Sequence, residues 1–152
     1  MSQPLSAVRL VQAACIDGTD LRSWSSRSPD DNKRGHGDPD ARLGRGRKGF
    51  YLGYRSVFLT DIEGFPLGHI EALANVNEPL LVEPLLDKVL GEDIVVELLA
   101  GYSGFEARRV FEVLEDRRIA PLIAWRRMKG RDNPVDMLSV RDRIDVEGPE
   151  YK

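Results

Sequence analysis

The chain has 152 residues, enough for one domain, and its hydrophobic content of 41% and charged content of 31% are typical of a soluble globular protein. No apolar run approaches the ~20 residues of a membrane-spanning helix. The single cysteine, Cys15, excludes an intrachain disulfide or a cysteine-rich zinc site, so we expect a cytoplasmic protein.

The net charge of −3 conceals two basic clusters. Nine basic residues and only four acids lie between residues 22 and 55, and a second group of cations lies within residues 126–131. A mildly acidic protein can hold a polyanion against such patches. The alternative is a charged loop that is merely solvated.

The first predicted element is a strand over residues 8–17, which ends at Asp17 and Gly18. Asp-Gly is typical of a tight turn, so Asp17 is either a turn residue or a carboxylate at the rim of a sheet, where it could bind a divalent metal. Residues 22–48 are predicted to form a long basic loop. Aromatic and β-branched residues predict a second strand over 49–61, and residues 66–76 return as a third, antiparallel strand.

Two helices are predicted in the second half. Asn77 can cap the first, and the apolar spacing of residues 82–90 gives it one buried face; Pro84 should kink this helix or delay its start. Residues 93–100 form an apolar run typical of a buried strand. Ser103 and Glu106 then have the spacing of a capping box, with a buried helical face at residues 107, 110, 111 and 114. The last predicted strand covers residues 119–125.

This order predicts a mixed α/β sheet. The first three strands should be antiparallel, and the fourth and fifth should add in parallel through helical crossovers. The arrangement is ribonuclease-H-like and covers residues 8–126, followed by a polar segment over 127–152. Its first and fourth strands would end side by side, so Asp17 and Tyr102 should meet across one cleft. An unrelated α/β sandwich of the same order is the alternative.

Five short fragments, in this order and spacing, resemble the DDE-domain transposases of bacterial and archaeal insertion sequences. They are residues 16–22 (IDGTDLR), 38–42 (DPDAR), 53–55 (GYR), 74–78 (ANVNE) and 101–106 (GYSGFE). The resemblance implies a site of three carboxylates holding two divalent cations, Mg²⁺ or Mn²⁺. One cation would activate a water or a 3′ hydroxyl, and the other would stabilise the leaving oxygen of the cut phosphodiester.

Carried onto this chain, the resemblance makes Asp17 the first acid, both catalytic and a metal ligand. Tyr102 stands where the second acid is expected, and a neutral phenol is a poor magnesium ligand. Phe105 matches the aromatic residue that packs under the following helix. The third acid should lie on a later helix, but Glu147 and Glu150 stand beside Gly and Pro, which oppose a helix.

We therefore expect a truncated, degenerate copy of a transposase that has lost its activity. Its partner would be DNA, both element ends and target, in the nucleoid. One alternative is a non-catalytic DNA-binding or regulatory remnant that pairs with itself or with an intact transposase. Another is an unrelated metal-dependent nuclease that draws a second ligand from Asp61 or Glu97. The expected DNA contacts are Arg42, Arg45, Arg47, Lys48, Arg55, Arg126, Arg127 and Lys129.

Overall fold

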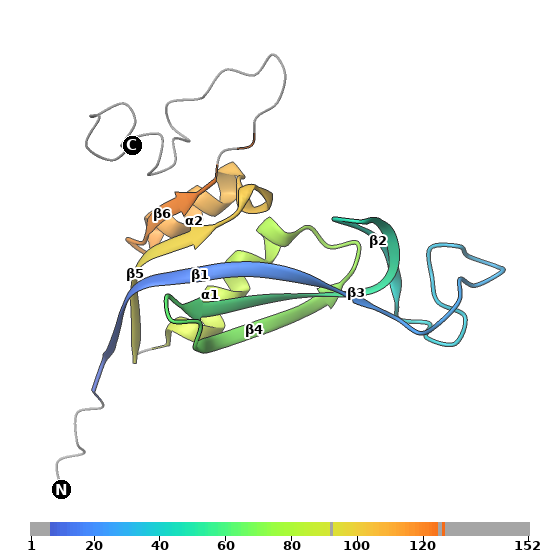
Figure 1. The fold of residues 1–152 in the computed structure, drawn as a ribbon, viewed down its shortest axis with the longest axis horizontal. Helices are drawn as coiled ribbons and strands as arrows, with labels where there is room; N and C mark the ends of the chain where they lie inside the picture. Colours follow the sequence, from blue (N-terminus) through green and yellow to red (C-terminus); the bar gives the residue numbers. More distant parts are fainter. Residues whose placement is uncertain (1–6, 92, 125, 127–152) are drawn as a thin grey trace, which may run out of the picture.

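The computed structural model describes residues 7–91, 93–124 and 126. In these residues the chain forms a sheet and two α-helices, α1 and α2, with two short 3₁₀ helices, η1 and η2 (Figure 1). The predicted C-terminal segment, with Arg127 and Lys129, lies outside the described residues. The bounds are β1 Arg9–Arg22, β2 Arg42–Gly46, β3 Gly49–Asp61, β4 Pro66–Leu73, η1 Glu78–Leu81, α1 Val82–Leu90, β5 Ile94–Gly101, η2 Ser103–Phe105, α2 Arg108–Asp116 and β6 Ala120–Ile123.

The six strands form one mixed sheet in the order β2-β3-β1-β5-β6, with β4 also paired to β3. Strand β3 is long enough to pair with β2 through residues 49–53 and with β4 beyond them. β3 is antiparallel to β1, β2 and β4, whereas β5 joins β1 in parallel and β6 joins β5 in parallel. The predicted strand directions and the mixed α/β class are confirmed.

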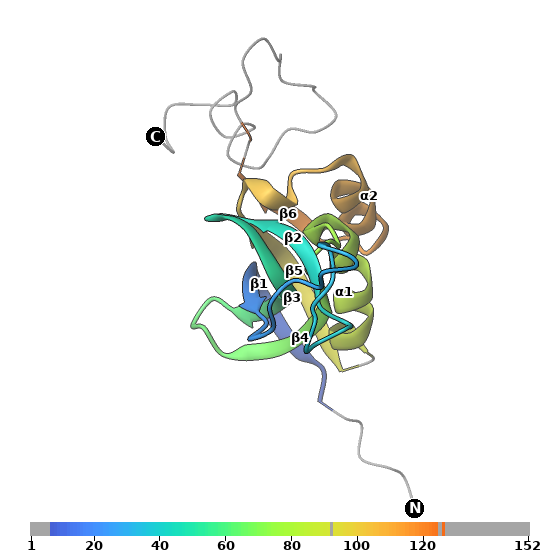
Figure 2. The same cartoon turned by 90° about the vertical axis from the view of Figure 1, so that its right-hand side faces the viewer.

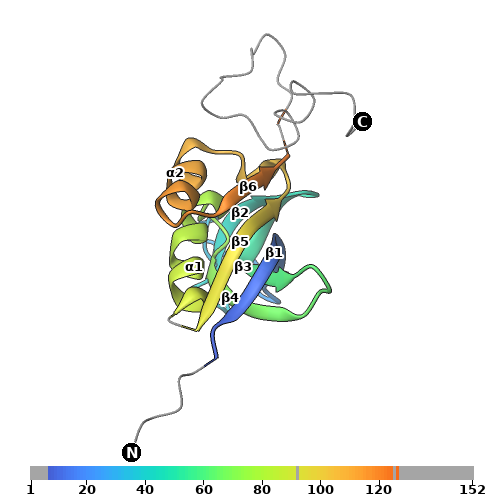
Figure 3. The ribbon, with the colours of Figure 1, turned by 90° about the vertical axis from the view of Figure 1, so that its left-hand side faces the viewer.

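Both helices pack on the same face of the sheet (Figures 2 and 3). Alternate residues of β3 point into this layer, among them Val57 and Leu59, which are fully buried. Leu85 and Leu86 of α1 and Val110 and Leu114 of α2 fill it from the helical side. The apolar spacing therefore identified most of the helical part of the core. No described helix has the length and apolar character needed to cross a membrane.

Strand β1 does not end at Asp17. Its antiparallel ladder with β3 continues through Asp17 opposite Phe58 and Gly18 opposite Val57 to Arg22 opposite Gly53. The predicted Asp-Gly turn is wrong, because the long partner strand supplies ladder hydrogen bonds that outweigh a local turn preference. Asp17 consequently lies within a strand rather than at its tip.

The predicted loop over 22–48 is also too long, because its last residues form β2 and a hairpin with β3. Gly49, at φ 107°, makes the turn of this hairpin in a conformation that favours glycine. The rest of the loop is ordered around Asp38, whose carboxylate accepts hydrogen bonds of 2.8 Å from the hydroxyls of Ser23 and Tyr54. These bonds hold the pKa of Asp38 below its usual value.

The helix starts differ from the predictions. Asn77 makes no side-chain cap; a 3₁₀ turn precedes α1, which begins at Val82. Pro84 is its third residue, where a helical N–H has no intrahelical acceptor, so proline delays the helix without kinking it. The capping box is wrong: Ser103 begins η2 and α2 begins at Arg108 without a side-chain cap.

Candidate functional site

The end of the parallel ladder between β1 and β5 brings two of the predicted residues to the same part of the sheet. In the parallel ladder Ala14 pairs with Leu99 and Ile16 with Gly101, so β1 and β5 are neighbours as predicted. Asp17 and Tyr102 are the next residues along the two chains, and both line one groove at this edge of the sheet. The predicted adjacency of the two strands is confirmed, and the negative charge of Asp17 is near enough to contribute to the raised pKa of Tyr102.

The groove is an open depression of about 1480 Å³, larger than most small-molecule sites. The end of β1 and residues 100–102 form its floor, η1 forms one side, and the β2–β3 hairpin forms another. Seven cations and four acids line it. The cations are Arg22, Arg45, Arg47, Lys48, Arg55, Arg109 and Arg126, and the acids are Asp17, Asp20, Glu78 and Glu106. The excess of cations suits a polyanion.

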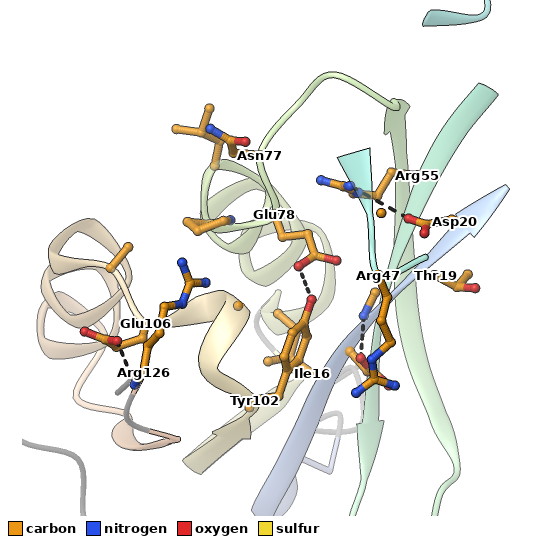
Figure 4. A pocket seen from close by; sticks show the side chains of 18 of the residues that line it. Ile16, Thr19, Asp20, Arg47, Arg55, Asn77, Glu78, Tyr102, Glu106 and Arg126 are labelled. Atoms are coloured by element: carbon orange, nitrogen blue, oxygen red, sulfur yellow. Dashed lines mark hydrogen bonds and ion pairs between the residues drawn. The ribbon is translucent and has the colours of Figure 1, made fainter. Parts of the chain in front are cut away.

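Tyr102 is hydrogen-bonded to Glu78, the first residue of η1. Its hydroxyl donates to the Glu78 carboxylate, and the two side chains point toward one another (Figure 4). Burial is the main cause that raises the pKa of Tyr102, followed by this hydrogen bond and by the negative charges of Glu78 and Asp17. The phenol therefore stays neutral, and its hydroxyl is hydrogen-bonded to one of the carboxylate oxygens of Glu78.

Phe105 holds this arrangement from below. Its ring is fully buried and meets the ring of Tyr102 edge-on, with centroids 5.2 Å apart and planes at 83°. This placement agrees with the role that the resemblance gave to Phe105. Edge-to-face contacts of this kind fix the orientation of the exposed ring.

The acids of the groove do not form a shared metal centre. One oxygen of Asp17 accepts the backbone N–H of Gly18 at 2.8 Å, and Asp20 forms an ion pair of 3.7 Å with Arg55. Among the described residues, no group of three His, Cys, Asp or Glu side chains could hold a metal ion. Asp61 and Glu97 do not line the groove, and Asp61 pairs with Arg9 at 3.1 Å.

The donor set therefore does not fit the two-cation site that the resemblance implies. Such a site needs three carboxylates, and Tyr102 supplies a neutral phenol in place of one of them.

The predicted DNA contacts separate into three groups. Arg45, Arg47, Lys48 and Arg126 line the groove, and Figure 4 shows Arg47 and Arg126 on opposite sides of Tyr102. Arg42 lies elsewhere, because its guanidinium donates to three carbonyl oxygens of residues 39–41 and lines a second, smaller pocket.

Arg55 also lines the groove, but it is 7% exposed and bonded within the protein. Its guanidinium donates to the carbonyl oxygens of Arg45 and Val76, both at 2.9 Å. These bonds join the hairpin to the segment before η1. Arg55 therefore positions the hairpin, whether or not it also contacts DNA.

Glu78 is the site residue that the sequence reasoning missed. It belongs to the fragment ANVNE, which contributed to the resemblance, but it was not considered as a site acid. Its carboxylate closely approaches Gly18, where a Cβ would overlap Oε1, so it lies against the face of β1 that carries Gly18, and the preceding residue Asp17 points to the other face. An acid directly before proline at a helix start was the available signal.

The phenol of Tyr51, which is buried in β3, allows a test by pH. Burial raises the pKa of Tyr51 to about 12, above the ordinary value of ~10 in an unfolded chain. The neutral phenol is therefore favoured by folding. Its contribution to stability is complete below pH ~10 and is lost as the pH rises toward about 12. Denaturant titrations at several alkaline pH values should show a shallower loss for Tyr51→Phe than for the unmodified chain; equal slopes would contradict the assignment.

No protein-family model matches the chain, and no curated protein matches it. The class of protein is therefore defined by the fold and the groove alone: a mixed α/β domain with a cation-rich groove where the parallel ladder of β1 and β5 ends.

Proposed function

We propose that the protein is a transposase-derived DNA-binding domain that holds DNA in this groove without cutting it. The observation that carries the proposal is the placement of Tyr102. It directly follows β5, where the parallel ladder with β1 ends just before Asp17 and where the resemblance requires a second acid, and it is bonded to Glu78.

The sheet supports a ribonuclease-H-like ancestry. The antiparallel strands β1, β3 and β4, to which β2 is added, are followed by two strands that join in parallel through helical segments, and the first strand is central, between β3 and β5. This is the arrangement that the resemblance implies. In that arrangement the catalytic carboxylates would have stood just after the last paired residues of β1 and β5, at positions 17 and 102.

The charges of the groove support DNA as the partner. Arg47 and Lys48 at the hairpin turn and Arg126 on the other side of Tyr102 would contact phosphates, which position a nucleic acid without reading its sequence. Asp17 alone cannot organise two cations, so we expect binding without cleavage. Pairing with a second copy or with an intact transposase stays a prediction.

Two measurements on one preparation test the proposal. The chain should bind duplex DNA with an affinity that falls steeply with salt, and the double variant Arg47→Gln/Lys48→Gln should reduce the salt slope by about two, one for each lost phosphate contact. Arg108→Gln, an exposed arginine on α2 outside the groove, is the matched control and should leave the slope unchanged. Binding that does not respond to salt would contradict the proposal.

The second measurement is nicking of supercoiled DNA with Mg²⁺ or Mn²⁺. We expect none from the unmodified chain, and Tyr102→Asp asks whether a second acid restores any. Robust nicking by the unmodified chain would overturn the inactive assignment. Nicking that required Asp17 but did not depend on position 102 would favour an unrelated nuclease.

A further inference from the structure

We infer that the β2–β3 hairpin is a ribbon that enters the major groove of duplex DNA, with Phe50 and Arg45 against the base edges. The inference rests on the proposed function, since it specifies which form of DNA the protein binds and through which element.

The tip of the hairpin extends beyond its neighbours in the sheet. The ladder of β1 with β3 ends at Arg22 opposite Gly53, whereas β2 and β3 remain paired as far as Gly46 opposite Gly49. The last backbone contact from the β1 side is the N–H of Ser23 to the carbonyl of Leu52. Residues 45–50 therefore form a two-stranded ribbon. One face of it packs against Asp20 at Gly46, and Figure 2 shows its tip apart from the helices.

The ribbon is basic. Residues 45–50 contain three cations and no acid. Arg45, Arg47 and Lys48 line the main groove. The second pocket, beside the ribbon, is lined by Lys33, Arg34, Arg42, Leu43, Phe50, Asn75 and one acid, Asp31, which pairs with Arg34 at 3.6 Å. Cations on two sides suit an element with a phosphate backbone on each side, as in a groove of the duplex.

Phe50 adds an exposed apolar side chain to this basic surface. It is 65% exposed, and it pairs in register with Arg45, whose guanidinium lies 5.9 Å from the centre of its ring. In the major groove an arginine can bond to guanine O6 and N7, and a phenylalanine can contact the methyl group of thymine. The two side chains therefore match groups that base edges present there.

The shape and rigidity of the ribbon fit the same site. A major groove about 12 Å wide admits a two-stranded ribbon. Gly44 and Gly46 let one face of this ribbon approach Ala74 and Asp20 closely, and the pair Arg45 and Phe50 belongs to the other face. Its base is fixed: Arg55 holds the carbonyl of Arg45, and Tyr51 is buried and donates to the carbonyl of Tyr54 at 3.0 Å. A fixed element loses little conformational entropy when it binds.

The test compares labelled DNA probes by fluorescence anisotropy with the full chain. The probes are a mixed-sequence duplex, its single strand, and the same duplex with glucosylated hydroxymethylcytosine, which fills the major groove. We expect at least about tenfold weaker binding to the glucosylated duplex and to the single strand. Phe50→Ser should weaken duplex binding by about tenfold, the lower part of the range for base contacts. Phe65→Ser, an exposed phenylalanine at the distant β3–β4 turn, is the matched control.

The outcomes separate the two proposals. Suppose that duplex binding depends on salt but does not change with glucosylation or with Phe50→Ser. This result would overturn the insertion of the ribbon into the major groove and leave the groove of the protein as the DNA site. Tighter binding to the single strand would also overturn the ribbon. An absence of binding to every probe would overturn the proposed function itself.

Discussion

Replacing Phe105 with alanine should lower the free energy of unfolding by about 3–5 kcal/mol, the range for a fully buried phenylalanine. The side chain is 0% exposed and belongs to the core shared by both helices and the sheet. Phe105 also supports the floor of the groove. Its ring meets the ring of Tyr102 edge to face, and it lies 3.5 Å from the position that a Cβ on Gly101 would take. A loss of this size is a large part of the stability of a typical domain.

Phe50→Ala provides the matched control for Phe105, because it removes the same atoms from a ring that is 65% exposed. The control should change stability by less than about 0.5 kcal/mol, as most surface substitutions do. Both values come from the midpoints and slopes of chemical denaturation. A loss below 1 kcal/mol for Phe105→Ala, or equal losses for both variants, would show that the core is not packed around this ring.

The parts of the fold that the sequence predicted well depend on residues near each other in the chain. The apolar positions at helical spacing identified Leu85, Leu86, Val110 and Leu114 as core residues, and all four are buried. Strand direction followed from connection length, because helical crossovers lead to parallel neighbours. The adjacency of Asp17 and Tyr102 followed from that topology.

The errors arose where a distant partner decides the structure. Strand β1 runs through Asp17 and Gly18 because β3 pairs with it over its whole second half, which no local pattern contains. Strand β2 was missed because residues 42–46 are rich in Arg and Gly, and only the pairing with β3 makes them a strand.

The site was predicted in part for the same reason. Asp17 and Tyr102 were identified by a motif. Glu78 comes from η1 and contacts Tyr102, and this bond depends on how η1 packs beside Gly18 of β1. The basic residues were predicted as one group. The fold divides them between the groove, the second pocket and a buried position, because alternate residues of a strand point to opposite faces.

Replacing Arg55 with methionine should lower the free energy of unfolding by about 2–4 kcal/mol. Methionine keeps much of the volume but removes the charge. The carbonyl oxygens of Arg45 and Val76 lose their donors, and Asp20 loses its cation. Arg9→Met is the control, because its ion pair with Asp61 is exposed on the arginine side and should contribute less than about 1 kcal/mol.

The same variant also tests whether Arg55 positions the hairpin. If the guanidinium fixes the base of the ribbon, backbone amides of residues 43–52 should exchange hydrogen faster in Arg55→Met, under conditions in which the core of α1 stays protected. Combining Arg55→Met with Asp20→Asn should cost less than the sum of the two single changes, because each removes one member of the same ion pair. Additive losses, with unchanged exchange in the ribbon, would mean that Arg55 serves only to fill space between the sheet and η1.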